Sequence, residues 1–206
     1  MRCPHNAENG CDDRLRTIPG HSPANNGWSS TTDNCWEFDR GQWLGGQVSD
    51  VFTREYLRIA SEVLDDVESA IRDCDDTTIN AVPARGGVPA SGVNSVFALV
   101  THIDGMVGFW LGSVVSGLDI PRDRAAEFVA TGTVAEALAL LDQTRGRVLA
   151  WMPRALEDGI ANPGATGSTR ADIASATPQF VVLHVLRELA QHAGHLQICR
   201  DLVVPD

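Results

Sequence analysis

The chain has 206 residues and a formal net charge of −11 at pH 7, with 16 basic and 27 acidic side chains. This acidic balance argues against a nucleic acid or an anionic membrane surface as partner, because both reward clustered positive charge. The length suits one domain with a sizeable core. No apolar run approaches the length of a transmembrane helix, and the first residues contain no apolar segment of a secretion signal. We therefore expect a cytoplasmic protein.

Residues 1–47 differ in composition from the rest of the chain. They are rich in Asn, Gly, Ser, Asp and Pro and lack a periodic apolar face, which predicts an extension with little regular structure. The five cysteines are irregularly spaced and odd in number, so a disulfide framework is not expected. Residues 48–206 are predicted to form the second part of the chain, a helical domain.

Apolar residues recur every three or four positions from about residue 49 to 73, which predicts the first long helix. A loop follows over residues 74–93, because its Gly and Pro residues disfavour helix interiors and central strands. The same periodicity predicts a second helix from about residue 94 to 116. We interpret the loop between them as a crossover that also lies near the functional site.

The segment 118–128 predicts a turn and a short helix. Its charge cluster, which we expect to be solvated, consists of Arg122, Asp123, Arg124 and Glu127. The alternative is an anion-binding role for Arg122 or Arg124. A third long helix should begin after Thr131 or Thr133 and reach Met152 or beyond, where Pro153 should kink or end it. Residues 158–176 are predicted to be a loop, and no segment shows strand-like alternation of useful length.

The last long helix is predicted over residues 177–203, with Thr177 as N-cap and Pro178 as its first residue. Apolar side chains occupy one face and polar side chains the opposite one. A narrow strip beside the apolar face consists of His184, Glu188, His192, His195 and Cys199. A carboxylate and an imidazole four residues apart on a helix can reach one point in space. Because an unpaired buried charge is expensive, a bound metal ion would explain their position.

Four long amphipathic helices predict an all-α four-helix bundle, a fold that builds metal sites from inward-pointing side chains. His102 lies on the shoulder of the apolar stripe of the second helix. Together with Glu188 and His192 it would form a His₂Glu set that leaves one coordination position open, the usual arrangement of catalytic zinc. The same donors also accept Ni²⁺, Co²⁺ or Fe²⁺.

Three stretches carry a family resemblance, namely ALVTHIDGMVGFWL, PRDRAAEF and VLHVLRELAQHAGHLQICRDL. Over about residues 51–203 the chain resembles the DinB-like superfamily, in particular the branch of mycothiol-dependent maleylpyruvate isomerase and mycothiol S-transferases. The resemblance implies His102, Glu188 and His192 as the metal ligands. It also implies an up-up-down-down bundle whose first two helices are parallel, and a divalent metal, usually zinc, that activates a low-molecular-weight thiol such as mycothiol. The thiolate then attacks an electrophile, in detoxification or in secondary metabolism.

Other residues have weaker predicted roles. His184 and His195 either orient the ligands or act as bases, and Tyr56, Trp110 and Arg200 could line the pocket that holds the thiol or substrate. Two alternatives to a thiol S-transferase (or an isomerase-like enzyme) remain open: a zinc hydrolase that uses metal-bound water, and a bundle that binds metal or thiol without turnover. The expected partners are a small-molecule thiol and an electrophile, for a monomer or a homodimer.

Overall fold

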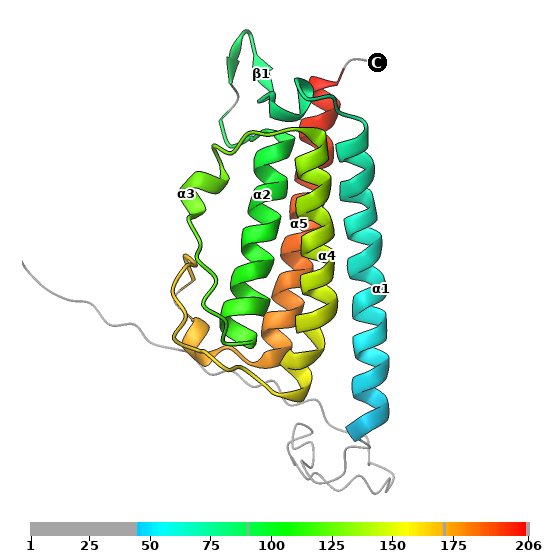
Figure 1. The fold of residues 1–206 in the computed structure, drawn as a ribbon, viewed down its shortest axis with the longest axis vertical. Coiled ribbons are helices and arrows are strands. Elements are labelled where there is room, and N and C mark those ends of the chain that lie inside the picture. The colour runs from blue at the N-terminus through cyan, green and yellow to red at the C-terminus, as the bar shows by residue number, and fades with distance from the viewer. Residues whose placement is uncertain (1–44, 90, 171, 205–206) are drawn as a thin grey trace, which may run out of the picture. The chain divides into compact units, whose positions relative to one another are not determined.

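A computed structural model describes residues 45–89, 91–170 and 172–204, which form an all-α bundle of four long helices (Figure 1). The long helices are α1 (Gly45–Arg72), α2 (Val96–Val107), α4 (Val134–Glu157) and α5 (Pro178–Val203). A π-helix, η2 (Gly108–Val115), directly continues α2. The predicted all-α four-helix bundle is thereby confirmed, whereas the predicted extension lies almost entirely outside the described residues.

The helix ends follow from local sequence. Thr177 accepts a hydrogen bond from the backbone N–H of Phe180, and Pro178 occupies the first helical position, as predicted. Thr133 and Glu136 form a reciprocal capping box at the start of α4. Pro153 lies inside α4 instead of ending it, since that helix continues to Glu157.

Short elements occupy the connections. They are η1 (Thr78–Asn80), β1 (Ala84–Arg85), β2 (Val88–Pro89), α3 (Arg124–Glu127) and η3 (Ile173–Ser175). The strands β1 and β2 pair antiparallel across Gly86 and Gly87, whose φ angles of 63° and 80° suit a tight two-residue hairpin turn. Two residues per strand are too few to produce a readable alternation, so the sequence did not predict this hairpin.

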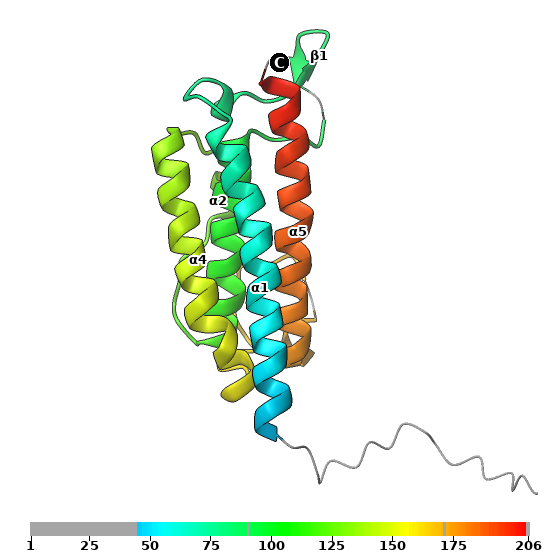
Figure 2. The ribbon, with the colours of Figure 1, turned by 90° about the vertical axis from the view of Figure 1, so that its right-hand side faces the viewer.

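The helices run up, down, down and up, which corrects the implied up-up-down-down order (Figures 1 and 2). Residues 74–93 do not cross the bundle, because they are held at the end where α4 begins. There Asp76 accepts a hydrogen bond from the backbone N–H of Val134, and the Asn80 side chain bonds to the backbone of Gly132. The crossover is instead residues 116–133, which carry α3 back along the bundle and make α2 and α4 parallel (Figure 1).

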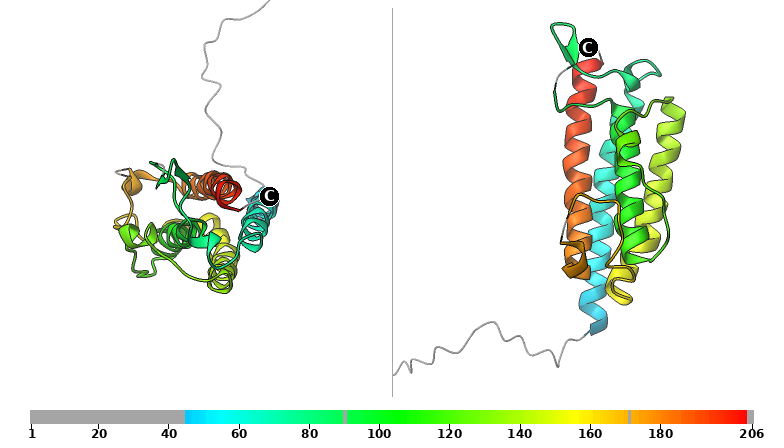
Figure 3. Two further views of the ribbon diagram at one scale, coloured as in Figure 1. Left: turned by 90° about the horizontal axis from the view of Figure 1, so that it is seen from above. Right: turned by 90° about the vertical axis from the view of Figure 1, so that its left-hand side faces the viewer.

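The core lies between the four helices, and the continuous helix of α2 and η2 is its most buried part. By length and composition alone, residues 96–115 could cross a membrane. However, 83% of the most apolar 18-residue stretch within them is buried inside the bundle. Packing against the neighbouring helices therefore accounts for its hydrophobicity. Seen from above, α3 and the segment before α5 lie on the side away from α1 (Figure 3).

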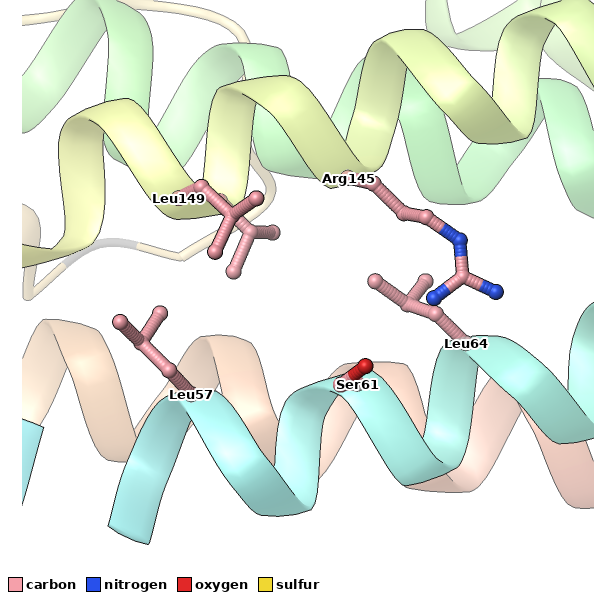
Figure 4. Close-up of a pocket in the computed structure, with 6 residues that line it drawn as sticks. Leu57, Ser61, Leu64, Arg145 and Leu149 are labelled. Atoms are coloured by element: carbon pink, nitrogen blue, oxygen red, sulfur yellow. The ribbon is translucent and has the colours of Figure 1, made fainter. Parts of the chain in front are cut away.

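Between α1 and α4 the surface has only a small apolar hollow of about 50 Å³. Its lining consists of Leu57, Ser61, Leu64, Arg145, Val148 and Leu149 (Figure 4). Leu57 lies opposite Leu149, whereas Leu64, further along α1, lies near Arg145, earlier in α4 (Figure 4). This pairing identifies α1 and α4 as antiparallel neighbours.

Candidate functional site

The antiparallel contact of α2 with α5 brings two of the predicted metal ligands together inside the bundle. The rings of His102 and His192 meet edge to face with centroids 4.6 Å apart, and His102 is only 3% exposed. One turn before His192 on α5, the Glu188 Oε2 atom lies 3.4 Å from His192 Nε2. All three predicted ligands thus approach one region, through pairwise contacts centred on His192.

Glu188 also faces His184, one turn earlier on α5. The His184 Nδ1 atom lies 3.7 Å from Glu188 Oε1, so Glu188 lies between two imidazoles on the same helix face. Trp110 meets the His184 ring edge to face at 4.6 Å, and the Phe180 ring stacks on it at 5.7 Å. Trp110 belongs to the π-helix η2, and short π-helical segments often occur at functional sites.

Glu127 belongs to this region, although the sequence did not predict its role. It is 6% exposed, and its Oε2 atom lies 2.6 Å from His102 Nδ1. Arg122 donates to the same carboxylate from Nε and Nη2, at 2.7 and 3.1 Å. The prediction of a solvated charge cluster is therefore wrong for Arg122 and Glu127, because each buried charge is paired with the other.

A signal for this burial lies in Gly105, one turn after His102 on α2. A Cβ atom at Gly105 would clash with Glu127 Oε1, so glycine lets the carboxylate approach the helix this closely. A glycine inside a helix often marks such a packing reason. On the other side, Asp123 caps the short helix α3 by accepting from the N–H groups of Ala125 and Ala126, which fixes the segment that carries Glu127.

The hydrogen bonds set the charge and tautomer of this pair. Burial acts to raise the pKa of Glu127, but the hydrogen bonds from His102 and Arg122 outweigh it and leave that pKa below its usual value. An ionised carboxylate only accepts hydrogen bonds, so His102 carries a proton on Nδ1. In the neutral ring the lone pair is then on Nε2. A carboxylate that orients a histidine in this way is typical of metal-binding histidines.

Burial, with a smaller contribution from the charge of His102, lowers the pKa of His192 to about 4. The ring is therefore neutral at pH 7, which is the form that binds metals. Within the described residues, its Nδ1 atom is buried without a hydrogen-bond partner. Burial acts to raise the pKa of Glu188, but the hydrogen bond and the positive charge of Arg187 outweigh it and leave that pKa below its usual value, so Glu188 is ionised.

A polar cavity of about 250 Å³ opens beside these residues, on the side of α3 and the segment before α5. The residues that line it are Met106, Trp110, Arg122, Arg124, Ser168, Thr169, Arg170, His184, Arg187 and Glu188. Arg122 Nη1 donates to the backbone oxygen of Gly167 at 3.2 Å and so ties the segment 158–176 to the buried Glu127. Of the predicted site residues, His184, Trp110 and Glu188 reach this cavity.

The other predicted residues lie elsewhere. Tyr56 is buried in the core on α1, where burial raises the pKa of its hydroxyl, and it does not line the cavity. Arg200 pairs with Asp73 and Asp201 at the C-terminal end of α5. His195 is half-buried beyond His192 on α5 and does not line the cavity either. Neither Tyr56 nor Arg200 lines the cavity, so its geometry does not support a binding role for them.

The donor chemistry of His102, Glu188 and His192 fits a divalent cation, because two neutral imidazole nitrogens and a carboxylate match a catalytic zinc set. The unpartnered Nδ1 of His192 and the Glu127 bond that leaves His102 Nε2 available agree with that use. In the described part of the chain, however, no group of three or more His, Cys, Asp or Glu side chains is placed so that it could hold a metal ion. The triad therefore stays a prediction.

Comparisons with known proteins give one match. A family model described as the DinB superfamily matches residues 60–196, which is more than half of the chain. No curated protein and no solved structure matches it. The matched range contains His102, Glu127, Glu188 and His192 as well as every residue that lines the cavity.

Proposed function

Because the chain belongs to the DinB superfamily, we propose that it is a metal-dependent transferase that activates a low-molecular-weight thiol, with mycothiol as the preferred thiol, for attack on a small electrophile. One observation carries this proposal. His102, Glu188 and His192 approach one another from two helices, and Glu188 also lines the polar cavity. A purely structural bundle has no reason to bury these groups beside a cavity.

The metal would be held by His102, Glu188 and His192, with zinc preferred over nickel, cobalt or iron. When bound, a divalent cation lowers the pKa of a thiol that approaches it. The protein contributes orientation. Glu127 fixes the ring of His102, and Arg122 holds Glu127 in place, so that Nε2 of His102 is presented in a constant direction.

His184 is the side chain that we assign as base for the thiol. It lines the cavity, and burial lowers its pKa below the usual value, so the ring is neutral at pH 7 and can accept a proton. The sulfur then forms a bond with the electrophilic carbon. The displaced electron pair leaves with a leaving group, or it takes up the proton when the thiol adds across a double bond. His195, the other predicted base, does not line the cavity.

The test uses the purified full chain. We expect one divalent metal per chain by elemental analysis, and consumption of a thiol when a generic electrophile is present. His102→Ala and His192→Ala should each lose the metal and reduce thiol consumption by roughly a hundredfold or more. Glu62→Gln removes an exposed carboxylate on α1 and serves as the control that keeps both.

Two other results would replace this proposal. Product release in the absence of any thiol would indicate a hydrolase that uses metal-bound water. Tight binding of metal and thiol without conversion of any electrophile would indicate a binding protein. Metal-free protein with full thiol-transfer activity would contradict the assignment of the three ligands.

A further inference from the structure

The cavity is basic, although the protein is strongly acidic. Four of the sixteen arginines of the chain line it, against one acidic residue, Glu188. Clefts that gather one sign of charge raise the local concentration of ligands of the opposite sign. A protein of net charge −11 gains no solubility from such a cluster. Solubility therefore does not account for the concentration of arginines at this cavity.

The four arginines are not equivalent. Arg122 is committed to Glu127 and to the backbone of Gly167, and its side chain is only 6% exposed. The other three, Arg124, Arg170 and Arg187, remain in contact with water and bring their charges to the cavity from α3, from the loop before α5 and from α5 itself.

Each of these three has donors to spare. Within the described residues Arg124 forms no ion pair and lies over the Phe128 ring at 5.3 Å. Arg170 binds Asp172 through Nε and Nη2, which leaves Nη1 unused, and its guanidinium lies over the Phe180 ring at 5.0 Å. Arg187 pairs with Glu188 through Nη2 alone. A guanidinium group offers five N–H donors, in a geometry that matches a carboxylate.

The rest of the cavity wall suits a small organic molecule. Met106 and Trp110 give it an apolar and aromatic portion, and Ser168 and Thr169 add hydroxyl groups. Its volume of about 250 Å³ is below the ~300–1,000 Å³ of pockets that hold drug-sized ligands. A compact molecule with one apolar part and one anionic part would match both sides of this wall.

We propose that the electrophile of this protein is a small organic acid whose carboxylate is bound by Arg124, Arg170 and Arg187, with its carbon chain against Met106 and Trp110. The identification of the bound acid as the electrophile rests on the proposed function. The existence of the anion site does not depend on it. The carboxylate is bound and stays chemically unchanged. Its place near Arg187 puts the remainder of the molecule beside Glu188 and His184.

The first experiment measures binding alone, by calorimetry on the full chain in a buffer without phosphate or carboxylate. The probes are succinate and its neutral diamide, succinamide. Succinate should bind at least about tenfold more tightly than succinamide. The double variant with Arg124→Gln and Arg170→Gln should weaken succinate binding by about tenfold or more. The control Arg154→Gln, on an exposed position of α4 outside the cavity, should bind as wild type does.

A second measurement uses only the wild type, so that the proposal can be tested even if the double variant does not fold. Raising the salt concentration from about 0.05 to about 0.3 M should weaken succinate binding to the wild type and leave succinamide binding unchanged. Equal affinities for succinate and succinamide, or an unchanged affinity in a folded double variant, would overturn the proposal.

The last experiment tests whether the carboxylate that the arginines bind belongs to the electrophile or to the thiol. Thiol consumption is measured with the neutral thiol N-acetylcysteine amide and with fumarate or fumaramide. The ratio of thiol consumption with fumarate to that with fumaramide should fall by about tenfold in the double variant. Because this ratio is compared between the variant and the wild type, the intrinsic reactivities of the two electrophiles cancel. If the arginines instead favour N-acetylcysteine over its amide, the assignment to the electrophile is wrong. Succinate binding without any thiol transfer would support the anion site and count against the proposed function.

Discussion

The two helix pairs α1–α4 and α2–α5 use the same antiparallel bundle geometry for different purposes. Between α1 and α4, leucines line the contact (Figure 4). The charged Arg145 pairs there with Asp65 and Glu68 at the surface. Between α2 and α5, two histidines and a carboxylate are placed inside the bundle. Only the second pair buries groups that cost free energy unless something binds them, so chemistry is expected there and not at the first.

The largest expected difference is between Arg122, which pairs with a buried carboxylate, and Arg145, which pairs with carboxylates at the surface. Arg122→Gln should lower the free energy of unfolding by about 3–5 kcal/mol, because it leaves the buried Glu127 without its main cationic partner. Arg145→Gln, the matched change on α4, should cost less than about 1 kcal/mol, because its partners Asp65 and Glu68 lie at the surface. Urea unfolding of both variants measures the comparison. Equal losses would mean that the burial of Glu127 does not decide its energetics.

The α2–α5 pair should make stability depend on pH through His192. The pKa of His192 in the folded chain is about 4, below the value of about 6.5 in an unfolded chain. The unfolded state therefore binds more protons between these values, and stability falls as the pH drops through this window. After allowance for partial exposure, the loss is about 1–2 kcal/mol.

Chelator-treated wild type and His192→Gln, unfolded by urea at pH 7 and at pH 4.5, test this dependence. The wild type should lose more stability than the variant between the two conditions. Identical slopes would show that His192 is not the group responsible.

The smallest expected effect distinguishes two helical glycines. Gly105→Ala should destabilise the fold by about 1 kcal/mol, because its methyl group would displace the buried Glu127 carboxylate. Gly146→Ala, on the exposed side of α4 with nothing within 4 Å of the added carbon, should stabilise it by about 0.5–1 kcal/mol. Thermal unfolding of both variants gives the sign of each change. A stabilising Gly105→Ala would contradict the close approach of Glu127 to α2.

The sequence predicted the long helices and their faces because periodic apolar residues and caps such as Thr177 act locally. It did not predict the helix directions, because a connection of some twenty residues can either cross a bundle or turn back. In the folded chain, hydrogen bonds of the Asp76 and Asn80 side chains to the backbone where α4 begins hold this connection at one end of the bundle. Prediction from the resemblance therefore succeeded for the fold class and failed for the order of the helices.

The candidate site shows the same division. His102, Glu188 and His192 lie on periodic helices, so their inward faces could be predicted. Glu127 lies on a helix of four residues, too short for a periodic pattern, and its burial depends on Arg122 and Gly105, which contact it only in the folded chain. The arginines around the cavity come from three separate segments, and their meeting depends on the crossover that the resemblance did not imply.

The bond between His102 and Glu127 joins residues only 25 positions apart, and neither residue belongs to α4 or α5. The contact of His102 with His192 closes a much longer loop, which adds about 1 kcal/mol to the entropic cost of loop closure. Half of the ligand environment can thus assemble early, while the C-terminal helix is still undocked. Arrival of α5 would then be the step that completes the pocket, both during synthesis on the ribosome and after each local opening of the folded chain.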